Sequence, residues 1–215
     1  CSSDLETVDG RARRRNGKPG AQRDLACDIV SRGAFRHRRT HDDVVHFCRV
    51  DPGALDGVLR EFGRRIRTVK CHGTLYFDVT EKEWACAALI EAIRTFDPEI
   101  IVVAPAVSGT LDQVKASGLR VTAECYADRR YGPDGRIVNR SHPRATVENA
   151  ELAAAQILGV VRDGTVEAVD GTVIPMTADT FCLHSDTPGA AEMGKAVVAV
   201  LNAEGIEIKP TTELI

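Results

Sequence analysis

Apolar positions along this chain follow two alternating patterns from residue 51 onward. The stretch at 99–104 is a continuous apolar run rich in β-branched residues, which is typical of a buried strand. Between such runs, apolar residues recur at the three- and four-residue spacing of a helix face. Alternating strands and helices indicate an α/β fold around a parallel sheet. The pattern predicts strands at 66–69, 99–104, 119–122 and 180–183, with helices within 51–66, 80–93, 110–117, 148–162 and 188–203.

Local signals mark where several of these elements begin. Asp51 is placed to cap the first helix, with Pro52 at its first helical position. Thr80 and Glu83 have the spacing of a capping box, which predicts the start of the second helix. Asp170-Gly171 lies between two short apolar runs and predicts a hairpin, and a last short strand is expected at 206–208. The apolar stripe of the first helix consists of Leu55, Val58, Leu59, Phe62 and Ile66.

The first fifty residues have a different character. They are rich in Arg and Gly, as at 11–20 and 36–39, and their few apolar residues follow neither helical nor strand spacing. Such a segment can act as a phosphate-binding arm. We favour a solvated segment, because no aromatic side chains are interleaved for base stacking. We therefore expect a poorly patterned segment at 1–50, without regular structure up to residue 45, followed by one β/α domain at 51–215.

Composition narrows the classes of partner. The chain has 215 residues, 43% hydrophobic and 27% charged, which suits a globular domain with a proper core. A net charge of -3 gives no general attraction to nucleic acid or to anionic membranes, and neither is expected as a partner. No apolar stretch is long enough to span a bilayer, and no secretory signal opens the sequence. Seven scattered cysteines without a paired motif favour reduced, buried thiols in a cytoplasmic protein.

Polar side chains capable of catalysis follow three of the predicted strands. The carboxyl ends of parallel strands meet at one edge of a sheet, and active sites of α/β proteins are found there. The sequence therefore predicts a site at this edge that is assembled from three separate loops. The candidates are Lys70 and His72, Glu124 and Asp128, and His184 and Asp186.

The first loop offers a cation and an imidazole. Lys70 could stabilise a developing oxyanion or a phosphate, and His72 could move a proton near neutral pH or bind a metal. Gly73 lets a ligand approach the backbone closely. The structural alternative is that His72 satisfies buried backbone groups and Lys70 is solvated.

The second loop, which runs to residue 143, is long for a compact domain and therefore suggests a functional role. Glu124 and Asp128 are candidates for acid–base chemistry, and Arg129 and Arg140 for binding carboxylate or phosphate. The alternative is a surface network of Asp and Arg organised by the turn at 133–135.

The third loop pairs a histidine with an aspartate. His184 and Asp186 point to the same side of an extended segment, which favours a site. Asp186 could instead cap the helix that Pro188 begins.

These loops carry a resemblance to a known family. Residues 70–77 read Lys-Cys-His-Gly-Thr-Leu-Tyr-Phe and resemble the Lys-Pro-His-Gly-Ala-Leu-Tyr-Asn signature of the LamB/YcsF family, the A subunits of 5-oxoprolinase. Residues 127–135 read Ala-Asp-Arg-Arg-Tyr-Gly-Pro-Asp-Gly and resemble its Ala-Asp-Arg-x-Tyr-x-x-Asp-Gly loop. Residues 184–190 read His-Ser-Asp-Thr-Pro-Gly-Ala and resemble its His-Gly-Asp-Thr-Pro-Gly-Ala. The resemblance extends from about residue 54 to the C-terminus.

The resemblance implies a distorted (β/α) barrel of the glycoside hydrolase/deacetylase type. It further implies ATP-coupled cleavage of 5-oxo-L-proline to L-glutamate, together with partner subunits B and C. ATP is then bound by this chain or only by its partners. In that chemistry Lys70 would stabilise charge, Asp186 or Glu124 would position water, and His72 or His184 would carry protons. Binding of substrate or phosphate would fall to Tyr76, Arg129 and Arg140.

The chain also departs from the family pattern. The family's amino-terminal Asp-Leu-Asn-x-Asp-x-Gly-Glu motif and its early His-bearing motifs are absent, so we expect a barrel that is incomplete at its N-terminus. Two other functions therefore stay open. One is a metal-dependent amide hydrolase or deacetylase on the same fold, with His72, His184 and Asp186 as ligands. The other is a truncated subunit without catalytic activity.

Overall fold

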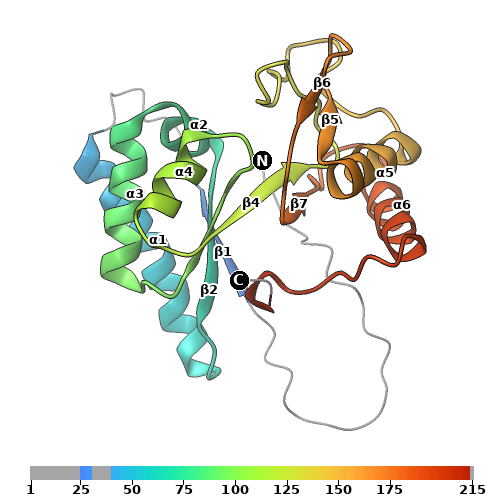
Figure 1. Ribbon diagram of the computed structural model, residues 1–215. Helices are drawn as coiled ribbons and strands as arrows, with labels where there is room; N and C mark the ends of the chain where they lie inside the picture. The colour runs from blue at the N-terminus through green and yellow to red at the C-terminus, as the bar shows by residue number, and fades with distance from the viewer. Residues whose placement is uncertain (1–24, 31–39, 214–215) are drawn as a thin grey trace, which may run out of the picture. The chain divides into compact units, whose positions relative to one another are not determined.

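The computed structural model describes residues 25–30 and 40–213 of the chain (Figure 1). Residues 1–24, 31–39 and 214–215 lie outside the described residues. The chain divides into two compact units, and each is described by itself. The N-terminal unit contains the described residues up to Thr122 together with 210–213, and the C-terminal unit contains residues 123–209.

Parallel strands form the centre of the N-terminal unit. Strand β1 (Leu25–Val30) pairs in parallel with β2 (Ile66–His72), and β2 pairs in parallel with β3 (Ile101–Pro105). The register places Asp28 and Val103 beside Lys70 on either side of β2. The strand order continues through β4 (Val121–Tyr126) to β7 (Thr180–Cys182). The expected α/β class with a parallel, barrel-type sheet is confirmed.

Helices cover this part of the sheet. Helices α1 and α3 pack side by side (Figure 1). The core beneath them consists of buried aliphatic side chains and three thiols, among them Val44, Ile66, Leu89 and Ile93. The helices of this unit are α1 (His41–Glu61), α2 (Gly73–Glu81), α3 (Glu83–Phe96) and α4 (Gly109–Ala116), followed near the C-terminus by a 3-10 turn, η2 (Thr211–Glu213).

The C-terminal unit joins the end of β4 to β7 in parallel, with Glu124 opposite Thr180 and Tyr126 opposite Cys182. Helices α5 (Ala150–Leu158) and α6 (Ala190–Ala203) pack against each other beside these strands (Figure 1). The expected hairpin at Asp170-Gly171 is confirmed. The remaining elements are a π-helical turn η1 (Gly159–Asp163) and the antiparallel strands β5 (Thr165–Glu167) and β6 (Val173–Pro175).

The first long helix begins earlier than the sequence predicts. Thr40 caps α1: its hydroxyl accepts from the Asp43 N–H at 3.2 Å, and the Thr40 N–H donates to the Asp43 carboxylate at 2.8 Å. This reciprocal capping box satisfies two groups at the helix end. The predicted start at Asp51 is therefore wrong, and Pro52 lies inside the helix. Strand β1 and the first turn of α1 also show regular structure within the segment expected to have none.

Three of the five residues of the predicted apolar stripe do not lie on the buried face of this helix, whereas Leu59 packs against the core and Ile66 is buried in β2. Leu55 and Val58 are exposed, and Phe62 is 72% exposed. The buried face instead carries Val44, Cys48 and Asp56. Asp56 lies inward because its carboxylate accepts from the backbone N–H of Ile66 at 3.2 Å and from Arg60 Nε at 2.6 Å. A polar residue with both acceptor oxygens satisfied therefore takes the place expected for an apolar one.

Three smaller expectations are also wrong. Thr80 does not cap α3, because its hydroxyl donates to the carbonyl oxygens of Tyr76 and Phe77 within α2. Leu152, which its helical spacing predicts to face inward from the helix at 148–162, is exposed. Residues 206–208 form no strand.

The cysteines behave as the sequence predicts. The five whose side chains are described are free and buried: Cys48, Cys71, Cys86, Cys125 and Cys182. Burial raises the pKa of the Cys86 thiol to about 11, so this thiol stays protonated at neutral pH. None of the helices within 40–213 combines the length and apolar character that crossing a bilayer requires.

Replacing Asp56 by Asn should destabilise the N-terminal unit. One carboxylate oxygen is replaced by an N–H donor that faces other donors, so we expect a loss of about 1–3 kcal/mol in unfolding free energy. Urea unfolding followed by circular dichroism measures this loss. Asp51→Asn on the exposed face of the same helix is the matched control and should change the unfolding free energy by less than about 0.5 kcal/mol. Equal effects of both variants would show that the Asp56 contacts are not stabilising.

Candidate active site

Three candidate residues lie in the N-terminal unit. Strand β2 continues to His72, so Lys70 is a buried residue within the strand and does not follow its end. His72 is the last residue of β2 and precedes the first turn of α2. Tyr76 is half-buried in α2, and its ring meets that of Phe77 edge to face at 5.3 Å. The predicted strand ends too early because a lysine is typical of a loop, whereas here the fold buries it.

The other candidates lie in the C-terminal unit. Strand β4 continues to Tyr126, so Glu124 is buried within the strand, although the sequence predicts it beyond the strand end. Asp128 lies two residues after the end of β4, and His184 and Asp186 follow β7. Because β4 and β7 are adjacent and parallel, their carboxyl ends lie at the same edge of this unit.

Asp128 and His184 form a close carboxylate–imidazole pair in this unit. The Asp128 side chain is fully buried, at 0% exposure. Its two carboxylate oxygens lie 3.1 and 3.0 Å from Nδ1 of His184. A carboxylate only accepts hydrogen bonds, so Nδ1 carries the proton and donates it. This contact leaves Nε2 on the opposite side of the ring, and the side chain of His184 is 22% exposed.

Two further donors complete the environment of the carboxylate. The backbone N–H of His184 donates to Oδ2 of Asp128 at 3.3 Å, and the hydroxyl of Thr187 makes a short hydrogen bond to the same oxygen. Burial raises the pKa of Asp128, but the hydrogen bond and charge of His184 and the hydrogen bond of Thr187 outweigh it, so that the pKa lies below its ordinary value. Asp128 is therefore ionised at neutral pH.

An aromatic ring fixes the orientation of the imidazole. Tyr126 is buried at the end of β4, and its ring stacks on that of His184 with centroids 5.5 Å apart and planes 5° from parallel. The backbone N–H of Tyr126 donates to the hydroxyl of Tyr131 at 2.7 Å. A ring held against His184 from one face restricts its rotation about χ2 and keeps Nδ1 directed at Asp128.

The two candidate arginines differ in their surroundings. Arg129 is buried and donates to the carbonyl oxygens of Val138, at 2.8 Å, and Ala145, at 3.4 Å. It therefore ties together the long loop after β4. Arg140 and Asp186 are 58% and 54% exposed and pair with each other at 3.3 Å. Of the two arginines, Arg140 is the one whose guanidinium is accessible to a ligand.

Several residues that support the pair are not evident from the sequence. Thr187 lies in the motif at 184–190, and its position three residues after His184 is the available signal. Tyr126 and Gln156 give no comparable signal, because stacking and long-range hydrogen bonds depend on the approach of elements distant in sequence. Asp186 does not cap α6, whose N-cap is Gly189 with φ of 77°.

The described residues do not form a metal centre. Within 25–30 and 40–213, no three His, Cys, Asp or Glu side chains gather in a way that could hold a metal ion. In the Asp128–His184 pair, the ring nitrogen and the carboxylate oxygens are directed at each other.

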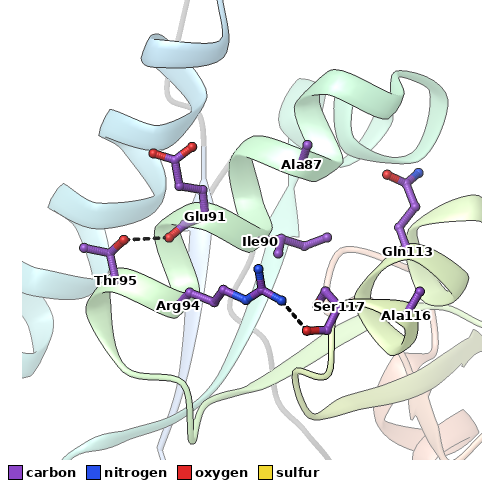
Figure 2. A pocket seen from close by; sticks show the side chains of 8 residues that line it. All are labelled: Ala87, Ile90, Glu91, Arg94, Thr95, Gln113, Ala116 and Ser117. Carbon is purple, nitrogen blue, oxygen red and sulfur yellow. Dashed lines mark hydrogen bonds between the residues drawn. The ribbon is translucent and has the colours of Figure 1, made fainter.

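An open depression lies elsewhere, in the N-terminal unit between α3 and α4 (Figure 2). It encloses about 650 Å³ and is lined by Ile90, Arg94 and Gln113, among others. Arg94 donates to the carbonyl oxygen of Ser117 across it. None of the candidate residues lines this depression, so it is not part of the predicted site.

The fold and this geometry define an α/β protein with a carboxylate–imidazole pair just beyond two adjacent parallel strands. The sequence profile of the LamB/YcsF family matches residues 28–215, and the chain belongs to that family. The match begins well before residue 54, where the motif resemblance begins.

Related proteins agree with this assignment. The chain is 37% identical to the 5-oxoprolinase A subunit of Acinetobacter baumannii (strain ACICU), over 85% of this chain and 72% of that protein. It is 34% identical to the corresponding 5-oxoprolinase protein of Pyrococcus horikoshii, over 87% of this chain and 74% of that protein. It also resembles the crystal structure of a lactam utilization protein from Thermus thermophilus. That likeness has a TM-score of 0.74 and 29% identity, and it covers 87% of this chain and 70% of that chain.

The ionised Asp128 should make stability depend on acid pH. Its folded-state pKa is lowered, so its contribution is present above the unfolded-state pKa of about 3.9 and is lost as pH falls through the folded value. Asp128→Asn should therefore flatten the fall of unfolding free energy below about pH 5 and lower stability at pH 7 by about 1–3 kcal/mol. Urea titrations at a series of pH values measure both effects.

Thr187 provides a matched pair of variants for the same measurement. Thr187→Val removes the hydroxyl donor and should raise the folded-state pKa of Asp128, so that the acid-induced loss of stability is smaller and ends at higher pH. Thr187→Ser keeps the hydroxyl and should resemble the parent. Identical acid profiles for Val and Ser would contradict the assigned hydrogen bond.

Proposed function

We propose that this chain is the A-type subunit of a 5-oxoprolinase, a hydrolase that cleaves 5-oxo-L-proline to L-glutamate in an ATP-coupled reaction. Family membership and the names of its relatives support the substrate. The observation that carries the proposal is the buried, ionised Asp128 bound to Nδ1 of a partly exposed His184. Such a pair is suited to removing a proton from water next to an amide carbonyl.

Hydrolysis of a lactam amide requires a general base that activates water, and His184 is suited to this role. A lactam amide is a poor electrophile. ATP, when bound, would supply a phosphoryl group to the carbonyl oxygen and leave as ADP, and the phosphoryl group would be released as inorganic phosphate once water has opened the ring. The remaining task of the protein is to deliver water to that carbon. Nε2 of His184 accepts the proton of the water while Asp128 stabilises the imidazolium that forms. The stacked ring of Tyr126 restricts rotation of the imidazole during this transfer.

Other candidates take supporting roles in this proposal. Arg140 is exposed and binds the carboxylate of the substrate, exchanging its contact with Asp186 for a charge-assisted one. Asp186 or Glu124 positions the water.

The residues present offer limited phosphate binding by this chain alone. Arg129 is buried and directs its donors at backbone carbonyls, and Arg130 pairs with Glu167 at 3.4 Å. Of the two candidate arginines, Arg140 is therefore the one that could bind either the substrate carboxylate or a phosphate group. We propose that ATP is held mainly by the partner subunits B and C, in a cytoplasmic complex.

A coupled assay tests this function. The full chain is mixed with its cognate B and C subunits, 5-oxo-L-proline and ATP, and glutamate release is measured. We expect ATP-dependent release that requires all three subunits. No release under these conditions would show that the chain is a non-catalytic member of the family. Metal analysis of the same preparation tests the metal-dependent alternative, which requires a stoichiometric bound ion.

The assay also tests the role of His184. His184→Asn removes the base and should lower turnover by about 100- to 10,000-fold. His46→Asn, on the exposed face of α1, is the control and should leave turnover unchanged. Equal turnover in the His184 variant and the parent would remove the pair from the mechanism.

A further inference from the structure

Gln156 on α5 binds the segment 126–129, which carries the two residues that support His184, Tyr126 and Asp128. Nε2 of Gln156 donates to the carbonyl oxygen of Tyr126 at 2.7 Å and to that of Arg129 at 3.0 Å. These two carbonyls flank Asp128 in the chain. One side-chain amide therefore spans the turn that follows β4, with one N–H for each carbonyl.

The orientation of this amide follows from its surroundings. A side-chain amide has two N–H donors on one atom and an acceptor on the other. If the amide were flipped, its oxygen would face two carbonyl oxygens, which is repulsive. Only a side chain with two donors on one atom can satisfy both carbonyls in this way, and Glu or Met of similar length cannot.

Backbone hydrogen bonds tie the same turn at its edges. The N–H of Ala127 donates to the carbonyl oxygen of Cys182 at 2.8 Å, and the N–H of Val147 donates to that of Asp128 at 3.0 Å. The carbonyls of Tyr126 and Arg129 face α5 instead. The contact with Gln156 therefore sets how far the turn, and with it the Asp128 carboxylate and the Tyr126 ring, lies from the helix.

Helix α5 is a rigid support for this contact. Asn149 caps its first turn by accepting from the N–H of Leu152 at 2.9 Å. Ala153 and Ile157 on the same helix are fully buried, each at 0% exposure. Functional groups are held more accurately by regular elements than by loops.

We propose that Gln156 is a positioning residue that holds the Asp128–His184 pair in register by clamping the turn between Tyr126 and Arg129. It touches no reacting atom and acts through Asp128 and Tyr126. Its effect on catalysis rests on the proposed function, whereas its effect on the geometry of His184 does not.

The clamp is tested first in the unmodified full-length protein. The side-chain N–H protons of Gln156 are observed by NMR and their exchange with solvent is measured, with Gln113 of the open depression as the internal comparison. We expect exchange at Gln156 to be at least about 10-fold slower than at Gln113, because both of its donors are directed at carbonyls. Equal exchange rates would overturn the proposal without any variant having to fold.

Variants then test the consequence for His184. The readout is the Nδ1–H proton resonance of His184, identified by its loss in His184→Asn. Gln156→Met, which keeps the length but removes both donors, should shift or broaden this resonance beyond detection. Gln156→Glu, which keeps the shape but loses the donors, should do the same. Gln113→Met is the control and should leave the resonance unchanged. An unchanged resonance in both Gln156 variants would overturn the proposal.

Kinetics distinguish positioning from binding. In the reconstituted assay, Gln156→Met should lower kcat by about 10- to 100-fold, since a displacement of about 1 Å at a reacting group has effects of this size. KM should change little, because Gln156 contacts only the backbone carbonyls on either side of Asp128 and is not proposed to touch substrate. A change in KM alone would contradict a positioning role. If the parent chain releases no glutamate, the proposed function fails, and the resonance of His184 still decides the role of Gln156.

Discussion

The buried charge of Asp128 is the constraint around which the C-terminal unit is arranged. A carboxylate that is removed from water is destabilised by several kcal/mol unless donors replace its hydration. Here the donors come from the segment after β7: the ring and backbone N–H of His184 and the hydroxyl of Thr187. The pairing of β4 with β7 is therefore coupled to the site, because only adjacent strand ends bring the acceptor and its donors together.

Support for this pair lies on its buried side. Tyr126 covers one face of the imidazole, Arg129 ties the long loop through two carbonyls, and Gln156 holds the turn from α5. The side chains of Arg129 and Gln156 satisfy backbone carbonyls that would otherwise be left without these donors. The partly exposed imidazole of His184 is thus held by a preorganised shell. Preorganised groups need little rearrangement as charge develops in a reaction.

The buried carboxylate of Asp56 shows that the hydrogen-bond partners of a carboxylate decide whether it has a structural or a chemical role. Asp56 is buried in α1, as Asp128 is after β4, and its oxygens are also satisfied. Its partners are Arg60, one turn away on the same helix, and the backbone of Ile66. These fixed donors cannot exchange a proton near neutral pH, so Asp56 joins a helix to a strand and does no chemistry. Asp128 faces an imidazole, a side chain that can accept and donate protons in catalysis.

The sequence by itself determined the α/β class, the Asp170-Gly171 hairpin and the motifs that contain Asp128 and His184, because periodicity, turn chemistry and short motifs are local properties. It misplaced the start of α1, because the Thr40–Asp43 capping box lies in a segment without an apolar period. It also chose the wrong buried face, because the stripe of Leu55, Val58 and Phe62 has the same spacing whether it faces the core or solvent. It also ended β2 and β4 too early, because Lys70 and Glu124 are polar residues that the fold buries within strands.

Only the tertiary structure decided that Arg129 is structural and that Thr187, Tyr126 and Gln156 support His184. Those roles depend on hydrogen bonds and ring contacts between elements up to about sixty residues apart, and spacing along one element carries no information about such contacts.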